Sequence, residues 1–266
     1  MTHPFSLLDV PVDSVAIHWF EQSSYAIKDD QGTLVQIDPY FPTDRPSDRF
    51  IYDSAPLDET TLPTNFVLLT HDHLDHTFPN SLARIQQMGW NTHYVGPEES
   101  INRLITENIV SNAETTIIQA GQTVSLGSMK AQAVFAKPEN GDPLANIDPP
   151  DVTHLGYIVE ASGHTLYFSG DPINTFAEHA DLIGAISAHH PDIGFLTNHP
   201  TEGEFPFFEG SLRMAQRIGV KYAVPAHYAC FVKRNYDPNE WAAQFSDGDP
   251  QPVIVPRNSH IIYPFE

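Results

Sequence analysis

The segment from His71 to His76 constrains this chain more than any other, because it crowds four potential metal ligands into six positions. His71, His73, Asp75 and His76 come directly after the short apolar run 65–70, which is typical of a buried strand. In an extended backbone, His71 and His73 would project to the same side. Imidazoles and carboxylates suit zinc, iron and manganese. The spacing therefore favours a metal site at a strand end over histidines on a solvated loop.

Strand and helix patterns around this segment predict an α+β fold. We expect two sheets packed face to face with helices outside, in one domain over residues 1–266. The expected strands are 14–20, 24–28, 33–37, 65–70, 93–96, 115–118, 130–135, 156–160, 165–168, 193–196 and 222–225, and the expected helices are 80–88, 98–108, 174–187 and 208–218. The proline-rich, acidic stretch through Pro63 has no sustained period and is expected to be a long surface loop.

Charge and composition narrow the classes of partner. The formal net charge is −21, from 34 acidic and 13 basic residues, so the surface should repel a phosphate backbone. A single cysteine excludes an internal disulfide framework, and the start of the chain lacks the pattern of a secretory signal. No apolar stretch approaches the roughly 20 residues of a membrane-spanning helix. We expect a cytoplasmic protein that binds neither nucleic acid nor membrane and takes a small-molecule substrate.

The sequence resembles the metallo-beta-lactamase superfamily. Residues 71–76 match its His-x-His-x-Asp-His motif without a departure. Four further segments occur in the superfamily's order, namely Glu21-Gln22, 37–40, 168–171 and 224–228. The resemblance spans nearly the whole chain and implies a four-layered αββα sandwich.

The resemblance also implies a set of ligands for two divalent ions, zinc or manganese, with iron possible. His71 and His73 would bind one ion, Asp75, His76 and His227 the other, and Asp171 would bridge them. Asp38 would support the metal loop from behind. The third histidine of the first ion is expected to be His154, although it lies nearer the following strand than the superfamily's common Gly-His-Thr-Pro-Gly pattern would place it.

Within the superfamily, the sequence is most similar to the L-ascorbate-6-phosphate lactonase branch. The similarity rests on residues 37–40, 156–160 and 225–231, together with 236–238. That branch is functionally mixed, so the similarity supports fold and metal chemistry and leaves the substrate open.

Several residues near the expected site are candidates for substrate binding or proton transfer. His199, Glu202 and Glu204 lie on a loop after a short strand, where they would either contact substrate or be structural and solvated. We expect Asp75 and His199 to take the catalytic proton role and Glu202 to contact substrate. The adjacent Lys233 and Arg234 would receive an anionic group, unless they are ordinary surface charges.

The sequence thus predicts a metal-dependent hydrolase in which a metal-bound hydroxide attacks a small ester, lactone or phosphoester. One alternative is a phosphodiesterase for a small nucleotide or lipid head group. Another is a metal-binding or regulatory protein that keeps the fold without turnover. A homo-oligomer is an open possibility.

Overall fold

The computed structural model describes residues 2–201 and 203–265 as two mixed sheets of seven strands. The first sheet has the order β14 (Ser259–Tyr263), β1 (Val15–Glu21), β2 (Ser24–Asp29), β3 (Leu34–Ile37), β4 (Phe66–Leu68), β5 (His93–Gly96) and β6 (Thr115–Ile117). The second has the order β13 (Gln251–Pro252), β12 (Tyr222–Ala226), β11 (Ile193–Thr197), β10 (His164–Phe168), β9 (Leu155–Ala161), β8 (Met129–Phe135) and β7 (Thr123–Leu126).

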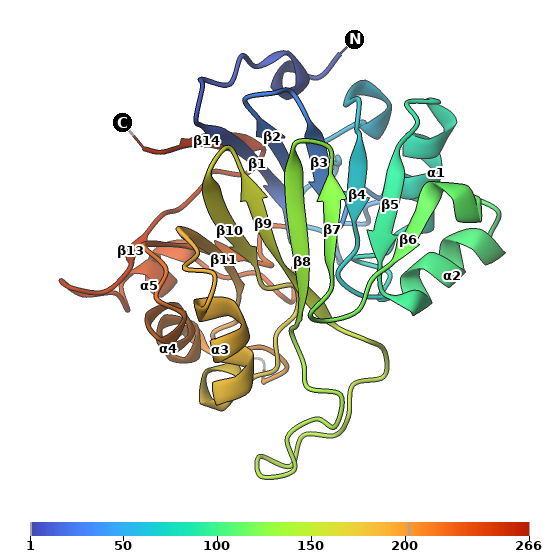
Figure 1. Ribbon diagram of the computed structural model, residues 1–266. Helices are drawn as coiled ribbons and strands as arrows, with labels where there is room; N and C mark the ends of the chain where they lie inside the picture. Colours follow the sequence, from blue (N-terminus) through green and yellow to red (C-terminus); the bar gives the residue numbers. More distant parts are fainter. Residues whose placement is uncertain (1, 202, 266) are drawn as a thin grey trace.

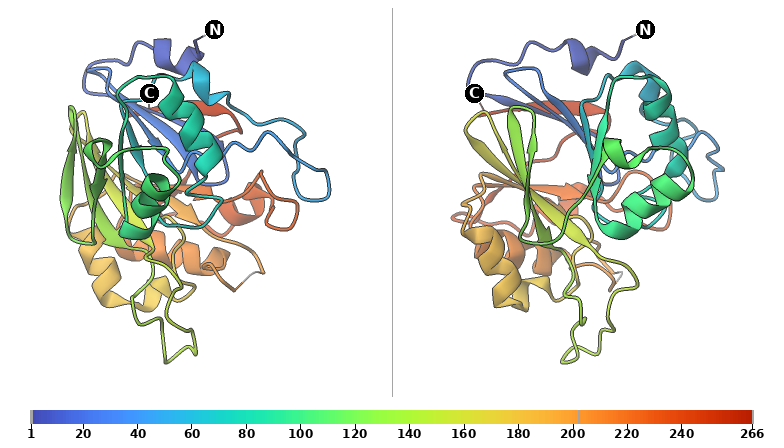
Figure 2. Two further views of the ribbon diagram at one scale, coloured as in Figure 1. Left: turned by 90° about the vertical axis from the view of Figure 1, so that its right-hand side faces the viewer. Right: turned by 45° about the vertical axis from the view of Figure 1, so that its right-hand side comes forward.

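The two sheets face each other, and helices cover their outer faces (Figures 1 and 2). α1 (Pro79–Gln87) and α2 (Glu98–Thr106) lie beside the first sheet, and their buried Leu82 and Leu104 belong to one apolar cluster with residues of β4 and β5. α3 (Ala180–Ser187) and α4 (Phe208–Ile218) cover the second sheet, with the short α5 (Pro238–Ala242) nearby. The expected αββα layering is confirmed.

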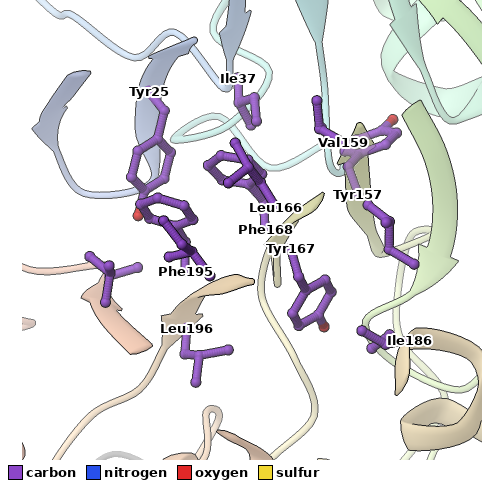
Figure 3. Packing of buried hydrophobic residues seen from close by; sticks show 14 of the residues in the cluster. Tyr25, Ile37, Tyr157, Val159, Leu166, Tyr167, Phe168, Ile186, Phe195 and Leu196 are labelled. Carbon is purple, nitrogen blue, oxygen red and sulfur yellow. The ribbon is translucent and has the colours of Figure 1, made fainter. Parts of the chain in front are cut away.

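The main core lies between the sheets, because both contribute large apolar side chains to it (Figure 3). Tyr25 of β2 meets Phe168 of β10 edge-on, with ring centroids 5.1 Å apart. Phe168 in turn stacks on Phe195 of β11 at 4.5 Å. Burial of such rings is the main source of stability for a sandwich of this kind. It also fixes one sheet against the other.

Most expected elements are confirmed, and the exceptions have local causes. The expected helix over 174–187 is wrong in its first half, because only a 3-10 turn forms at Phe176–Glu178 and the extended His179 separates it from α3. The strands β7, β13 and β14 and helix α5 were not expected. β14 pairs antiparallel with β1, so the end of the chain completes the sheet that its beginning opens.

The stretch 39–63 forms the expected loop without strands, apart from an isolated bridge between Phe50 and Phe231. None of the helices in the described ranges 2–201 and 203–265 has the length and apolarity to cross a membrane.

Candidate metal centre

The candidate ligands gather at one edge of the sandwich because of the direction of the strands that carry them. β3 and β4 are parallel, as are β10, β11 and β12, so the residues that follow them emerge together. His71 follows β4, Asp171 follows β10 and His227 follows β12. β9 runs antiparallel to β10, so His154, just before β9, reaches the same edge.

The segment 71–76 follows β4, as the sequence predicted, and forms a turn over residues 74–76. The backbone N–H groups of His76 and Thr77 both donate to the carbonyl of His73, at 3.0 and 2.8 Å. The turn still brings the rings of His71 and His73 together, with centroids 4.7 Å apart. It directs Asp72 away from the cluster, where both of its carboxylate oxygens accept hydrogen bonds from Arg103 at 2.6 and 2.7 Å.

Seven side chains form three overlapping groups whose ligand atoms lie within 4.8 Å of one another. These groups are His71 with His73 and His154, then His71 with His76 and Asp171, and then Asp75 with His76 and His227. The seven are the same residues that the sequence proposed, and they form one continuous array.

Asp171 lies between the two outer groups. Its Oδ2 is 3.6 Å from Nε2 of His71 and 3.3 Å from Nε2 of His76, and its Oδ1 is 3.8 Å from Nε2 of His227. A carboxylate with its two oxygens facing different histidines has the placement that a bridging ligand needs.

Buried polar atoms without partners show that this array fits cations. Among the described residues, Nε2 of His71, both ring nitrogens of His154 and Oδ1 of Asp171 are buried and have no hydrogen bond. Leaving such atoms unpaired costs roughly 1–3 kcal/mol each. Two divalent ions would bind Nε2 of His71, one ring nitrogen of His154 and Oδ1 of Asp171, which are the kinds of nitrogen and oxygen donor that zinc and manganese accept.

The pKa values of the histidines favour ligation for most of the array. Burial lowers the pKa of His154 to about 3, and it lowers the pKa of His71 and His227 as well. Neutral imidazoles are the form that binds metal. Burial also opposes the charged form of His76, but Asp171 and Asp38 together raise its pKa well above the usual value, so a cation at His76 would displace a proton.

Asp38 supports the array from behind. Its Oδ1 accepts the backbone N–H of Thr70 at 2.8 Å, and its Oδ2 lies 2.7 Å from Nδ1 of His76. This contact fixes the ring so that Nε2 faces the other ligands. Asp38 adopts a left-handed φ of 43°, and so does His227 at 67°. Non-glycine residues in this conformation are costly and cluster at functional sites.

A cavity of about 620 Å³ opens above the array. His73, Asp75 and Asp171 line it, as do three cations, Arg49, Lys233 and Arg234. Basic residues are scarce in this chain, at 13 of 266, and three of them line this cavity, beside the four carboxylates of Asp48, Asp75, Asp171 and Glu204.

Arg49 was not predicted from the sequence, and it lies in the acidic loop before the metal motif. The loop is attached to the segment of Lys233 by the bridge between Phe50 and Phe231, and the N–H of Val232 donates to the carbonyl of Arg49 at 2.9 Å. Arg234 forms an ion pair with Glu204 at 2.7 Å, which offsets its charge. Pairing across about 180 residues leaves no local signal in the sequence.

The remaining candidates lie on the loop after β11. His199 is buried with its ring 6.2 Å from that of Tyr236, and it is not among the described residues that line the cavity. Glu204 lines the cavity, and Glu202 lies outside the described residues. The catalytic role of His199 and the substrate contact of Glu202 stay predictions.

Comparison with protein families gives a match over most of the chain. The family described as "Beta-lactamase superfamily domain" matches residues 33–228. A UPF0173 metal-dependent hydrolase of Staphylococcus saprophyticus is 27% identical over 227 residues, which cover 83% of this chain and 89% of that protein. A probable L-ascorbate-6-phosphate lactonase of Salmonella heidelberg is 24% identical over 189 residues, covering 65% of this chain and 51% of that protein.

Solved structures share the fold. A metallo hydrolase, Igni18, of the archaeon Ignicoccus hospitalis superposes with a TM-score of 0.72 at 20% identity, over 95% of this chain and all of that one. An isothiocyanate hydrolase from Delia radicum gut bacteria gives a TM-score of 0.71 at 14% identity, over 92% of this chain and 98% of that one. At this level of identity the similarity establishes the fold alone.

Proposed function

The chain belongs to the beta-lactamase superfamily, and from that membership and its histidine array we propose that it is a metal-dependent hydrolase of small anionic esters, lactones or phosphoesters. The observation that carries the proposal is the continuous array of seven ligand side chains at the floor of a cavity. The relatives named as metal-dependent hydrolases support the same class.

Each part of the array has a role in this proposal. His71, His73 and His154 would hold one ion, Asp75, His76 and His227 the other, and Asp171 both. Divalent ions bound there would supply Lewis acidity and lower the pKa of coordinated water. Asp75, whose side chain is 24% exposed and lines the cavity, would accept a proton from the reacting group.

The cavity wall supports an anionic substrate. Arg49 and Lys233 are exposed and line the cavity, and no ion pair within the described ranges involves either. They would bind a phosphate or carboxylate while the scissile bond lies over Asp171. The lactonase branch is one source of such substrates, although the UPF0173 relative aligns over more of both chains.

The test combines metal content with turnover. The purified protein is analysed for metal per chain and assayed against panels of lactones, carboxylic esters and phosphodiesters, before and after chelation. We expect about two ions per chain and a hydrolytic activity lost on chelation, restored by zinc or manganese and absent in His73→Ala. Tightly bound metal without any turnover would instead support the metal-binding or regulatory protein, and failure to bind metal would overturn the proposal.

A further inference from the structure

Gln22 is a buried glutamine beside the second group of the metal array, and the proposed function gives it no role. It lies in the turn between β1 and β2, it is fully buried, and its φ of 52° is left-handed. Glutamine has no intrinsic preference for this conformation, so the surrounding contacts must hold it there.

The backbone of Gln22 is joined to the loop that carries His227. The N–H of Gln22 donates to the carbonyl of Tyr228 at 2.9 Å, and the N–H of His227 donates to the carbonyl of Gln22 at 3.1 Å. The same carbonyl accepts the indole N–H of Trp19 at 2.9 Å. These three bonds set the direction in which the side chain leaves the turn.

The side chain ends among the ligand atoms of the second ion. Nε2 of Gln22 lies 3.0 Å from Nε2 of His76, 3.2 Å from Nε2 of His227 and 3.5 Å from Oδ2 of Asp75. Two nitrogen ligands about 2.1 Å from one tetrahedral zinc ion are about 3.4 Å apart. The terminal amide of Gln22 therefore stands at the separation that ligands of one ion have from each other.

We propose that Gln22 is a further ligand of the second ion, through its carboxamide oxygen. In the observed orientation the oxygen accepts the N–H of Ser23 at 2.7 Å and the NH₂ group faces the histidines. Turning the amide over about its last bond exchanges the two atoms and directs the oxygen's lone pairs at the ion. The ion's attraction for this oxygen has to replace the hydrogen bond from the N–H of Ser23 and to offset the NH₂ group that then faces this N–H.

A neutral oxygen ligand has a consequence for the choice of metal. Carbonyl oxygens suit manganese better than they suit zinc, for which imidazole is already a strong ligand. Gln22 would thus favour manganese at the second position more than zinc. The inference rests on the proposed metal centre, because it assumes that His76, His227 and Asp75 bind an ion.

Calorimetric titration of the chelator-stripped protein with MnCl₂, and separately with ZnCl₂, tests whether Gln22 is a ligand of the second ion. Gln22→Leu keeps the volume and removes the oxygen. We expect it to weaken the second Mn²⁺ event at least about tenfold, to weaken zinc less, and to leave the first event unchanged. Gln22→Glu restores an oxygen ligand with added charge and should bind Mn²⁺ at least as tightly as the wild type.

Gln36→Leu is the matched control, because Gln36 of β3 is equally buried and its amide donates to Thr64, which is not part of the array. A second Mn²⁺ event in Gln22→Leu that equals or exceeds the wild type in affinity would overturn the inference. Tighter binding would identify the amide as a competitor of the ion. If Gln22→Leu does not fold, the Gln22→Glu variant provides the test. Weaker binding of the second Mn²⁺ ion by Gln22→Glu than by the wild type would also contradict ligation by Gln22. Wild-type protein that binds no ion would refute the metal centre itself.

Discussion

Oδ2 of Asp38 lies 2.7 Å from Nδ1 of His76, on the side of the ring away from Nε2, which faces the other ligands. The carboxylate thereby fixes both the orientation of the ring and the nitrogen that remains free to bind metal. Asp38 is itself held in a left-handed conformation at the end of β3, where it also accepts the N–H of Thr70. The first prediction follows from this contact.

Asp38→Asn should weaken the second metal site about 10- to 100-fold, because an amide neither orients the ring as firmly nor raises its basicity. Asparagine tolerates the left-handed conformation, so the fold should survive. Titration with zinc measures the effect. Asp9→Asn, at an exposed position, serves as the control. Equal zinc affinities for the Asp38 variant and the wild type would contradict a supporting role.

His154→Ala should remove the first ion and leave the second. Its ring stacks on that of His71 with centroids 4.1 Å apart, and both of its nitrogens lack partners among the described residues. Metal analysis should give about one ion per chain in place of about two. His189→Ala, outside the array, should change nothing. Two retained ions in the His154 variant would show that another group completes the first site.

Arg49→Gln should raise KM for the anionic substrate that the panel identifies by about tenfold, with little change in kcat. The guanidinium lies at the cavity wall and not among the metal ligands. It should therefore stabilise the bound substrate and the transition state to the same extent, which affects KM and not kcat. High salt should reduce the difference between variant and wild type. Lys130→Gln is the control, because Lys130 is not among the described residues that line the cavity. An equal loss in kcat would place Arg49 in the chemistry instead.

Stability should fall in acid, in part because of His18. Burial, together with the neighbouring rings of His3 and His260, lowers its pKa from 6.5 to about 4, against the opposing effect of the hydrogen bond to Asn258. Above pH 6.5 the ring is neutral in both folded and unfolded chains. Below it the unfolded chain binds the proton first, so the free energy of unfolding decreases towards pH 4, by up to about 3 kcal/mol.

Urea denaturation of the chelator-stripped protein between pH 7 and pH 4.5 measures this dependence. His18→Phe should make the dependence shallower and leave the part that the buried His71, His154 and His227 contribute through their own lowered pKa values. A substitution of the exposed His190 should leave the dependence unchanged. The same slope in His18→Phe and the wild type would assign the acid sensitivity to other groups.

Much of this site could be predicted from local sequence patterns. His71, His73, Asp75 and His76 are recognisable because four ligand-type side chains so closely spaced after an apolar run are rare outside metal sites. Asp171 and His227 were found through their motifs, each at the end of a buried strand. Alternating and periodic apolar residues also predicted most of the strands and helices, since burial of one face imposes that pattern.

The tertiary structure decided which distant groups share the site. Gln22 and His227 are neighbours because β1 and β12 end at the same edge of the sandwich, and Arg49 reaches the cavity because Phe50 pairs with Phe231. β14 could be placed only once its partner β1 was known. Contacts between segments about 200 residues apart depend on the order of strands in the sheets and on the packing of the two sheets. A local pattern encodes the faces that are buried but not the partners against which they pack.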